Sequence, residues 1–239
     1  LLYGRTEYRE VLEFAASLRA TGERSDSPRA VAFAATVAGE AHLLSGDLDA
    51  AFDELREGVD LHHQIGANAG EALSLQRLAE VHLERGENDE ALRLLDLALP
   101  LARWSALAHH LIQRIYGTMI RATSDADQAR MLVDQAAEAL GPSDDCIFCA
   151  VMIAVPSAIA CARVGDVEAA QQHLFVAEMS TTAWHGTAWP GAVAEAKAHI
   201  AAAEGRNDDA GDLFAEAVDL FNRAGQPLDA QRCRARSAV

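Results

Sequence analysis

The stretch Gly46-Asp47-Leu48-Asp49-Ala50-Ala51 decides the fold, because the chain repeats it in recognisable form four more times. The later copies begin at Gly86, Ser124, Gly165 and Gly205. Successive closing alanines lie 40, 38, 41 and 40 residues apart; they are Ala51, Ala91, Ala129, Ala170 and Ala210. A period of this length indicates stacked supersecondary units, since each unit can bury its apolar face only against its neighbours.

Each copy of the repeated stretch joins two helical patterns. In the second unit, apolar residues at 3.6-residue spacing predict a helix over 69–85, and Gly86 supplies the left-handed turn that ends it. Asn88 or Asp89 is expected to cap the next helix. The same pattern predicts full repeats at 29–65, 69–104, 106–140, 146–183 and 190–224, with partial repeats at 1–22 and 228–239. We therefore expect an all-α protein, a single solenoid over 1–239, which begins without Met and is expected to be a piece of a larger protein.

The composition limits the classes of partner. The net charge is −16, which argues against nucleic acid and anionic membrane surfaces as partners of this segment. No run of about 18 apolar residues is present, so no membrane-spanning helix is expected. Four cysteines in a helical repeat do not resemble a secreted disulfide scaffold, and a cytoplasmic location is expected.

Small and bulky residues recur at set places in every unit. The chain resembles the tetratricopeptide repeat (TPR), in which small residues at positions 8, 20 and 27 let paired helices approach and a bulky residue at position 24 fills the gap. Position 8 is Gly39, Ala79, Gly117, Ala158 and Ala198, and position 20 is the closing alanine of each repeated stretch. Position 24 is Leu55, Leu95, Val133, Leu174 and Phe214, and position 27 is Gly58, Ala98, Ala136, Ala177 and Ala217. The resemblance implies a right-handed α-solenoid of antiparallel helix pairs, although the period is nearer 40 than 34 residues.

The C-terminal part carries a second resemblance. The phrase from Ala217 to Cys233, with the Trp184–Trp189 segment, is similar to the repeat arms of large bacterial transcription regulators of the LuxR type. Such arms join a nucleotide-binding switch domain to a DNA-binding domain. This resemblance implies a regulatory arm that senses a ligand or a partner.

The first helix of each repeat is expected to line a concave groove. In the family, positions 2, 5, 9 and 12 of these helices face inward. The polar residues at these places, with Arg163 one position further, are Thr36, Glu40, Gln76, Glu80, Arg114, Thr118, Arg121, Glu195, His199 and Arg163. Arg114, Arg121 and Arg163 stand out in an acidic chain, because guanidinium groups could hold a carboxylate or a phosphate. The alternative is that these arginines are solvated surface residues that pair with nearby acidic residues.

The fourth unit contains a CxxC motif, Cys146-Ile147-Phe148-Cys149. A helix is expected over 146–164, and its first turn would place both thiols on one face, with His185 near them by topology. Zinc binding or redox chemistry is one interpretation. The alternative is structural thiols, because no second CxxC completes a zinc signature. Cys161 is expected in the core, and Pro156 is expected to kink this helix.

Other motifs point to contact rather than catalysis. The Trp184–Trp189 segment could contact a partner or a second copy in a homodimer, or could be a loop pinned by its tryptophans. The pairs His62-His63 and His109-His110 point about 100° apart on a helix, and are expected to be interface residues. Phosphate-loop, GxSxG and HExxH patterns are absent, so we expect no enzyme.

Three hypotheses follow from the sequence. The first is a sensing arm that binds a protein, a peptide or a small-molecule effector on its concave face. The second is a protein–protein scaffold without a sensing role. The third is a metal- or redox-responsive module at Cys146 and Cys149.

Overall fold

The structure is a computed structural model that describes residues 7–141, 146, 148–184 and 186–237, and within these ranges it contains twelve α-helices and no strand. The all-α prediction is confirmed. The helices are α1 (Tyr8–Arg24), α2 (Pro28–Ser45), α3 (Leu48–Gln64), α4 (Asn68–Glu84), α5 (Asn88–Arg103), α6 (Ala108–Ala122), α7 (Ala126–Leu140), α8 (Val151–Arg163), α9 (Val167–Thr181), α10 (Trp189–Ala203), α11 (Asn207–Arg223) and α12 (Pro227–Ser237).

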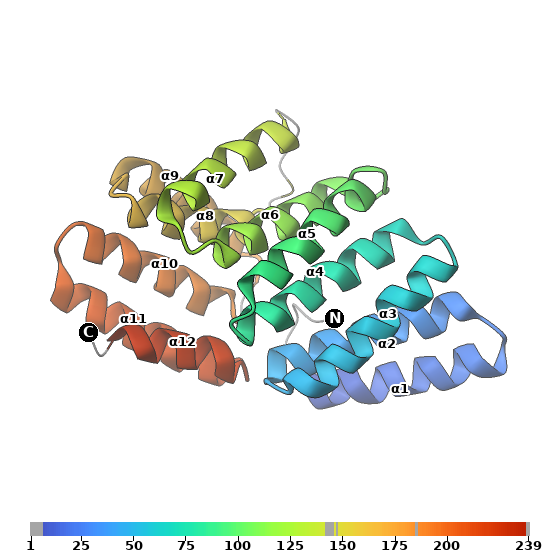
Figure 1. Ribbon diagram of the computed structural model, residues 1–239. Coiled ribbons are helices and arrows are strands. Elements are labelled where there is room, and N and C mark those ends of the chain that lie inside the picture. Colours follow the sequence, from blue (N-terminus) through green and yellow to red (C-terminus); the bar gives the residue numbers. More distant parts are fainter. Residues whose placement is uncertain (1–6, 142–145, 147, 185, 238–239) are drawn as a thin grey trace. The chain divides into compact units, whose positions relative to one another are not determined.

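The helices pack within two compact units, Leu1–Thr118 and Met119–Val239. In the first unit, α2 packs on α3 and α4 on α5, and α2 also contacts α4 (Figure 1). In the second unit, α8 packs on α9 and α10 on α11, and α8 also contacts α10. Each unit is therefore a stack of helix pairs in which the first helices of successive pairs are neighbours.

The two helices of a pair differ in burial. The first helices α2, α4, α8 and α10 bury residues around most of their circumference. The second helix α3 buries only a stripe, Ala51, Leu55, Gly58 and His62. A helix that is apolar all round belongs in an interior layer, and an amphipathic helix belongs at the surface. The first helices therefore form the inner layer of each stack.

The close approach of paired helices follows from the small residues at positions 8 and 27. A Cβ added to Gly39 in α2 would lie 2.5 Å from Cγ of Leu55 in α3, and Leu55 itself is fully buried. A Cβ on Gly58 would lie 3.1 Å from both Thr36 Oγ1 and Ser74 Oγ. The bulky residue thus fills the space that the small residue leaves.

The predicted turn at Gly86 is confirmed, with φ at 77° in the left-handed region. The predicted cap is wrong, because Asn88 and Asp89 already lie inside α5 and the N-cap position is Glu87. In three other repeats an aspartate holds the equivalent place and accepts a backbone N–H with its side chain: Asp47, Asp125 and Asp166. Glu87 makes no such bond. The cap thus belongs to the second residue of the repeated stretch.

The start of the fourth unit also differs from the prediction. Its first helix begins at Val151 rather than at Cys146. The backbone N–H of Val151 donates to Ser180 Oγ of α9 at 3.1 Å. Cys149 and Ala150 therefore lie in a turn before the helix, and Pro156 falls inside α8 as expected.

Among the helices of the described ranges, none is sufficiently long and apolar to pass through a membrane.

Candidate functional site

The polar residues predicted to line the groove of the first unit lie between α2, α4 and α6. Five of the six are buried, namely Thr36, Glu40, Gln76, Arg114 and Thr118, and the Glu80 side chain is only 12% exposed. Their polar atoms face one another across the first helices. They form an interior network, and this burial decides what they can do.

Glu40 is the centre of this network. Its Oε1 accepts from Arg114 Nη2 at 3.2 Å and also from Arg77 Nη2. Arg77 bridges onward to Glu80, which lies one turn along α4. Two carboxylates therefore face two guanidinium groups in a buried place, an arrangement in which each charge requires its partners.

Neutral side chains extend the network. Arg114 Nε donates to Gln76 Oε1 at 3.2 Å, and Gln76 Nε2 donates to Thr118 Oγ1 at 2.9 Å. Thr118 in turn lies 3.3 Å from Glu80 Oε1. Arg114 thus pairs with an acidic residue, but it is buried and is not the solvated surface residue that the alternative interpretation expected.

Arg77 was not singled out in the sequence, although it is central to the network. It follows position 5 of its helix directly, outside the positions expected to face inward. The available signal was a basic residue next to Gln76 and three residues before Glu80 on a helix of otherwise apolar neighbours. Only the packing of α4 between α2 and α6 brings Arg77 to Glu40.

A second buried set joins α2, α3 and α4. Thr36 Oγ1 lies 2.8 Å from Ser74 Oγ, 3.2 Å from His62 Nε2 and 3.1 Å from the Ala32 carbonyl. Burial lowers the pKa of His62, the nearby Arg29 lowers it further, and Glu71 opposes the change. The imidazole is therefore neutral at pH 7.

In the second unit, Glu195 of α10 pairs with Arg232 of α12 through two parallel bonds. Arg232 Nε and Nη2 lie 3.0 and 2.9 Å from the two carboxylate oxygens. Burial raises the pKa of Glu195, but the charge and hydrogen bonds of Arg232, with His199 and Arg121, outweigh it and leave the pKa below its usual value. Glu195 is therefore a buried carboxylate held in its charged form.

His199 lies one turn after Glu195 and packs edge-on against Phe214 at 5.3 Å between ring centroids. Burial lowers the pKa of His199 to about 4; Glu195 opposes the change, and Arg236, Arg163 and Arg232 add to it. His199 is therefore a half-buried neutral imidazole with arginines around it.

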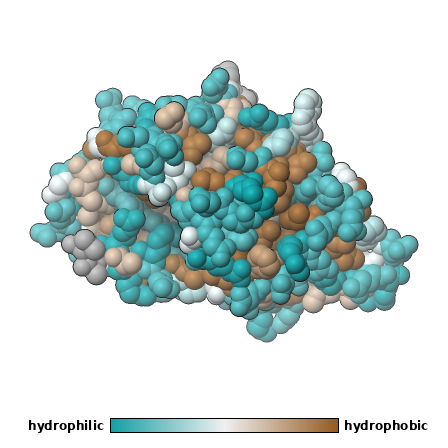
Figure 2. Space-filling model, viewed as in Figure 1, coloured by the Kyte–Doolittle hydropathy of each residue, from teal (hydrophilic) through white to brown (hydrophobic). Residues whose placement is uncertain are grey.

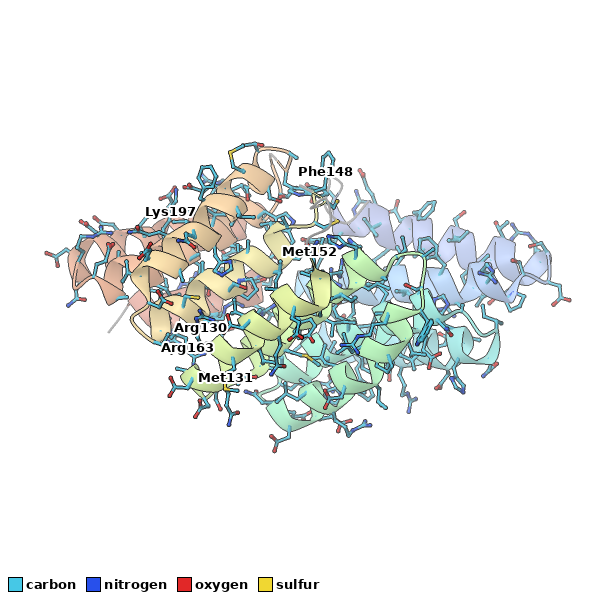
Figure 3. All side chains as sticks on the ribbon, turned by 90° about the horizontal axis from the view of Figure 1, so that it is seen from above. Arg130, Met131, Phe148, Met152, Arg163 and Lys197 are labelled. Atoms are coloured by element: carbon cyan, nitrogen blue, oxygen red, sulfur yellow. The ribbon has the colours of Figure 1, made fainter. Side chains whose placement is uncertain are left out.

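The arginines proposed from the sequence do not form one row of open guanidinium groups. Arg114 is buried and paired, as described above. Arg163, labelled in Figure 3, donates to the carbonyl of Thr123 at 3.3 Å and to that of Ser124, which follow α6. Arg121 is exposed. Arg163 therefore satisfies backbone carbonyls beyond the end of α6 in addition to any ligand role.

The two thiols of the CxxC motif are close together. Cys149 Sγ donates to Cys146 Sγ at 2.9 Å, and neither cysteine forms a disulfide. This bond lowers the pKa of Cys146, partial burial opposes the change, and the backbone N–H groups of Cys149 and Phe148 add to the lowering. His185 lies outside the described residues. Within the described ranges, His, Cys, Asp and Glu form no group of three or more that could hold a metal ion.

Cys161 and Cys233 differ from this pair. Both are fully buried, which confirms the prediction for Cys161. Burial raises the pKa of Cys161, and it raises that of Cys233 to about 12. These two cysteines are core residues with thiols that stay protonated.

The tryptophan segment is tied to the chain just before α8. Trp184 Nε1 donates to the Phe148 carbonyl at 2.9 Å, and the two rings meet edge-on at 6.1 Å. Trp184 and Trp189 are both half-buried. This contact agrees with the interpretation as a pinned loop.

Comparison with known proteins identifies the fold. No family model matches the sequence, and no curated protein matches it. Among solved structures, a thermophilic TPR protein of Thermus thermophilus matches with a TM-score of 0.54 at 17% sequence identity, over 87% of this chain and 97% of that chain. Together with the packing described above, this likeness shows that the chain folds as a TPR-like α-solenoid.

Proposed function

We propose that this chain is a binding module, without enzymatic activity, whose first helices present a preorganised face to a protein partner or a small-molecule effector. The observation that supports this proposal most is the buried network on Glu40, Arg77 and Arg114, with its counterpart on Glu195 and Arg232. Such bonds hold neighbouring first helices in one arrangement before a ligand arrives, and preorganisation lowers the ordering cost of binding.

In its finer form, the proposal is a cytoplasmic regulatory arm of a bacterial transcription regulator of the LuxR type. The similarity of the stretch from Ala217 to Cys233 to such arms supports this form. A ligand that binds one stacking arrangement of the repeats more tightly than another would increase the population of that arrangement. The change in stacking would then alter the position of neighbouring domains. In this form, the exposed Arg121 and Arg163 and the half-buried His199 would contact the ligand.

The test is hydrogen exchange of the purified chain with cell extract separated by size into small molecules and proteins. We expect one fraction to protect amides of α2, α4, α8 or α10 while α3 and α11 exchange as before. Protection by the small-molecule fraction supports an effector, and protection by the protein fraction supports a partner. Unchanged exchange in both fractions would contradict the binding function.

Sensing and scaffolding differ in a second measurement. A sensor changes the stacking of its repeats on binding, whereas a scaffold keeps it. Small-angle scattering of the chain with and without the active fraction, at saturation, should therefore give different curves for a sensor. Identical scattering curves together with protected amides would exclude a sensor and support a scaffold.

A second candidate function, a redox-responsive module, is favoured by the 2.9 Å separation of Cys146 Sγ and Cys149 Sγ. Oxidation by diamide would remove one hydrogen from each thiol, form a disulfide and reduce the diamide. Thiol titration before and after treatment should then show the loss of two thiols, and Cys146→Ser should prevent it. Cys161 and Cys233 provide the internal control, because both are buried and should stay unmodified.

Instead of forming a disulfide, the two thiols could bind a zinc ion. Elemental analysis of the chain purified without chelator checks for it. Absence of zinc together with thiols that do not respond to diamide would contradict this second candidate as a whole.

A further inference from the structure

A pocket of about 780 Å³ opens at one edge of the first unit. Its lining includes the three connections that lead into first helices: Ser27 before α2, Gly66 and Ala67 between α3 and α4, and Trp104–Leu107 between α5 and α6. The first turn of α4, Asn68–Gly70, borders it as well. Figure 1 shows these three connections along the same edge of the unit. The volume lies within the range of roughly 300–1,000 Å³ that is usual for small-molecule sites.

The walls are apolar and exposed. Trp104 is 87% exposed, Leu107 54% and Phe33 47%. Leu18 and Leu73 add to the apolar lining. In Figure 2, hydrophobic surface is interspersed with hydrophilic surface over the helices of this unit. Large apolar side chains gathered at one concave place mark a binding site more often than scattered ones do.

His62 contributes a polar group to the pocket. The residue is 4% exposed, and its Nδ1 has no hydrogen-bond partner among the described residues. Assigning the Thr36 hydroxyl as the donor to the Ala32 carbonyl makes Nε2 the ring donor to Thr36, and this assignment leaves Nδ1 as an acceptor. A buried acceptor without a partner is costly, and a ligand with an N–H or O–H group would supply the missing donor.

Gly70 explains how the ring fits. A Cβ at this position would lie 2.3 Å from both Nδ1 and Cε1 of His62. The imidazole therefore lies directly over the first turn of α4, in space that only glycine leaves open. The chain places an imidazole, rather than an apolar side chain, in the lining of a pocket that is mostly apolar.

The charge of the pocket opposes that of the chain. The sequence has 36 acidic against 20 basic residues, yet among the described residues that line the pocket Arg29 is the one with a permanent charge, and none carries a carboxylate. Arg29 is exposed and makes no ion pair within the part of the chain that the structure describes. The N-termini of α2 and α4 border the pocket without a side-chain cap, and they add partial positive charge.

We propose that this pocket binds a small aromatic carboxylic acid that carries an N–H or O–H donor. The aromatic body packs between Phe33, Trp104 and Leu107. The donor reaches His62, and the carboxylate faces Arg29 and the helix N-termini. The inference goes beyond the proposed binding function, because the pocket lies in the first unit, whereas Arg121, Arg163 and His199 lie in the second.

Four related probes separate the three contributions, with isothermal titration calorimetry of the full chain as the measurement. Indole-3-acetate has the ring, the N–H donor and the carboxylate. Its 1-methyl derivative lacks the donor, its methyl ester lacks the charge, and tryptamine carries a cation instead. We expect indole-3-acetate to bind most tightly. Loss of the donor should weaken binding about tenfold, in line with one hydrogen bond to a buried acceptor.

Two exposed positions give variants that leave the fold intact. Trp104→Ala should weaken binding of indole-3-acetate by about tenfold through lost ring contact. Arg29→Gln should weaken the binding of indole-3-acetate by about fivefold and leave the affinity for its methyl ester unchanged. Arg9→Gln is the matched control, since Arg9 is exposed on α1, where it pairs with Glu13. It makes the same change of charge outside the pocket.

Equal affinity for tryptamine and indole-3-acetate would overturn the proposal, as would binding that neither Trp104→Ala nor Arg29→Gln alters. Absence of heat for all four probes at millimolar concentration would overturn it as well. The proposed binding function is tested separately from the pocket. If size-separated extract still protects first-helix amides while the probes do not bind, only the pocket proposal is wrong.

Discussion

At the scale of single residues, a short aspartate side chain caps the second helix in three of the five repeats. Asp47, Asp125 and Asp166 accept from the backbone N–H three residues later, at 3.2, 2.9 and 3.2 Å. Glu87 and Arg206 hold the same place in the other two repeats and make no side-chain cap. The cap requires a short side chain with an acceptor, and neither glutamate nor arginine provides one.

Asp125→Ala should therefore lower the free energy of unfolding by about 1 kcal/mol, because it removes the acceptor for the Gln128 N–H. Asp125→Ser should keep most of the stability, since serine caps equally well. Urea unfolding followed by circular dichroism measures both. Equal losses for the two variants would show that charge rather than capping matters at this position.

His199 should make stability depend on pH. Its pKa is about 4 in the folded chain against an ordinary 6.5, so the unfolded chain binds more protons between these values. Stability is then complete above pH 6.5 and falls as the pH drops through that window. Between pH 7 and pH 5 the loss from this residue should be about 2 kcal/mol.

The comparison with His199→Gln isolates this effect. Burial also lowers the pKa of His62, His110 and His173, so the wild-type chain alone would report several groups together. Urea unfolding at pH 7 and pH 5 should show a smaller difference for the variant than for wild type. A difference of the same size in both would remove His199 as a source of the pH dependence.

At the scale of helices, close packing of a pair depends on the small residue that faces the partner helix. Gly39→Ala should destabilise the chain by roughly 1–3 kcal/mol, because the new Cβ would lie 2.5 Å from Leu55 Cγ. Gly211→Ala is the matched control: nothing lies within 4 Å of its new Cβ, inside α11. It should stabilise by about 0.5–1 kcal/mol through helix propensity. Thermal unfolding of both variants checks the opposite signs.

The helix boundaries show which local signals were sufficient. The predicted helix over 69–85 is α4 at Asn68–Glu84, since its apolar period and Gly86 are local features. The helix expected from Cys146 begins at Val151, and Ser180, far away in the sequence, accepts from the Val151 N–H. The first N–H groups of a helix have no acceptor within it. Local pattern thus locates a helix, and a tertiary hydrogen bond satisfies a backbone group at its start.

At the scale of the whole molecule, buried charge joins helices from different repeats. Glu40→Gln should cost about 3–5 kcal/mol, because it leaves the guanidinium groups of Arg77 and Arg114 without a carboxylate they share. Arg93→Ala removes an exposed pair with Glu90 and should change stability by less than about 1 kcal/mol. Chemical unfolding compares the two.

Hydrogen exchange of Glu40→Gln extends this test to the two compact units. Stability in repeat arrays is carried by contacts between neighbours. Amides of α2 and α4 should therefore exchange faster, while those of α10 and α11 keep their wild-type rates. Equal acceleration in both units would show that the chain opens as one cooperative body.

The sequence by itself determined the repeat, the helical class and the small and bulky positions, because each is a local or periodic property that any single unit carries. It also placed the polar residues of the first helices on one side. Only the tertiary structure decided that Arg77 and Arg114 both pair with Glu40, and that Trp104, Phe33 and His62 surround one pocket. These contacts join residues about 30 to 75 positions apart, and their partners are set by how successive helices stack.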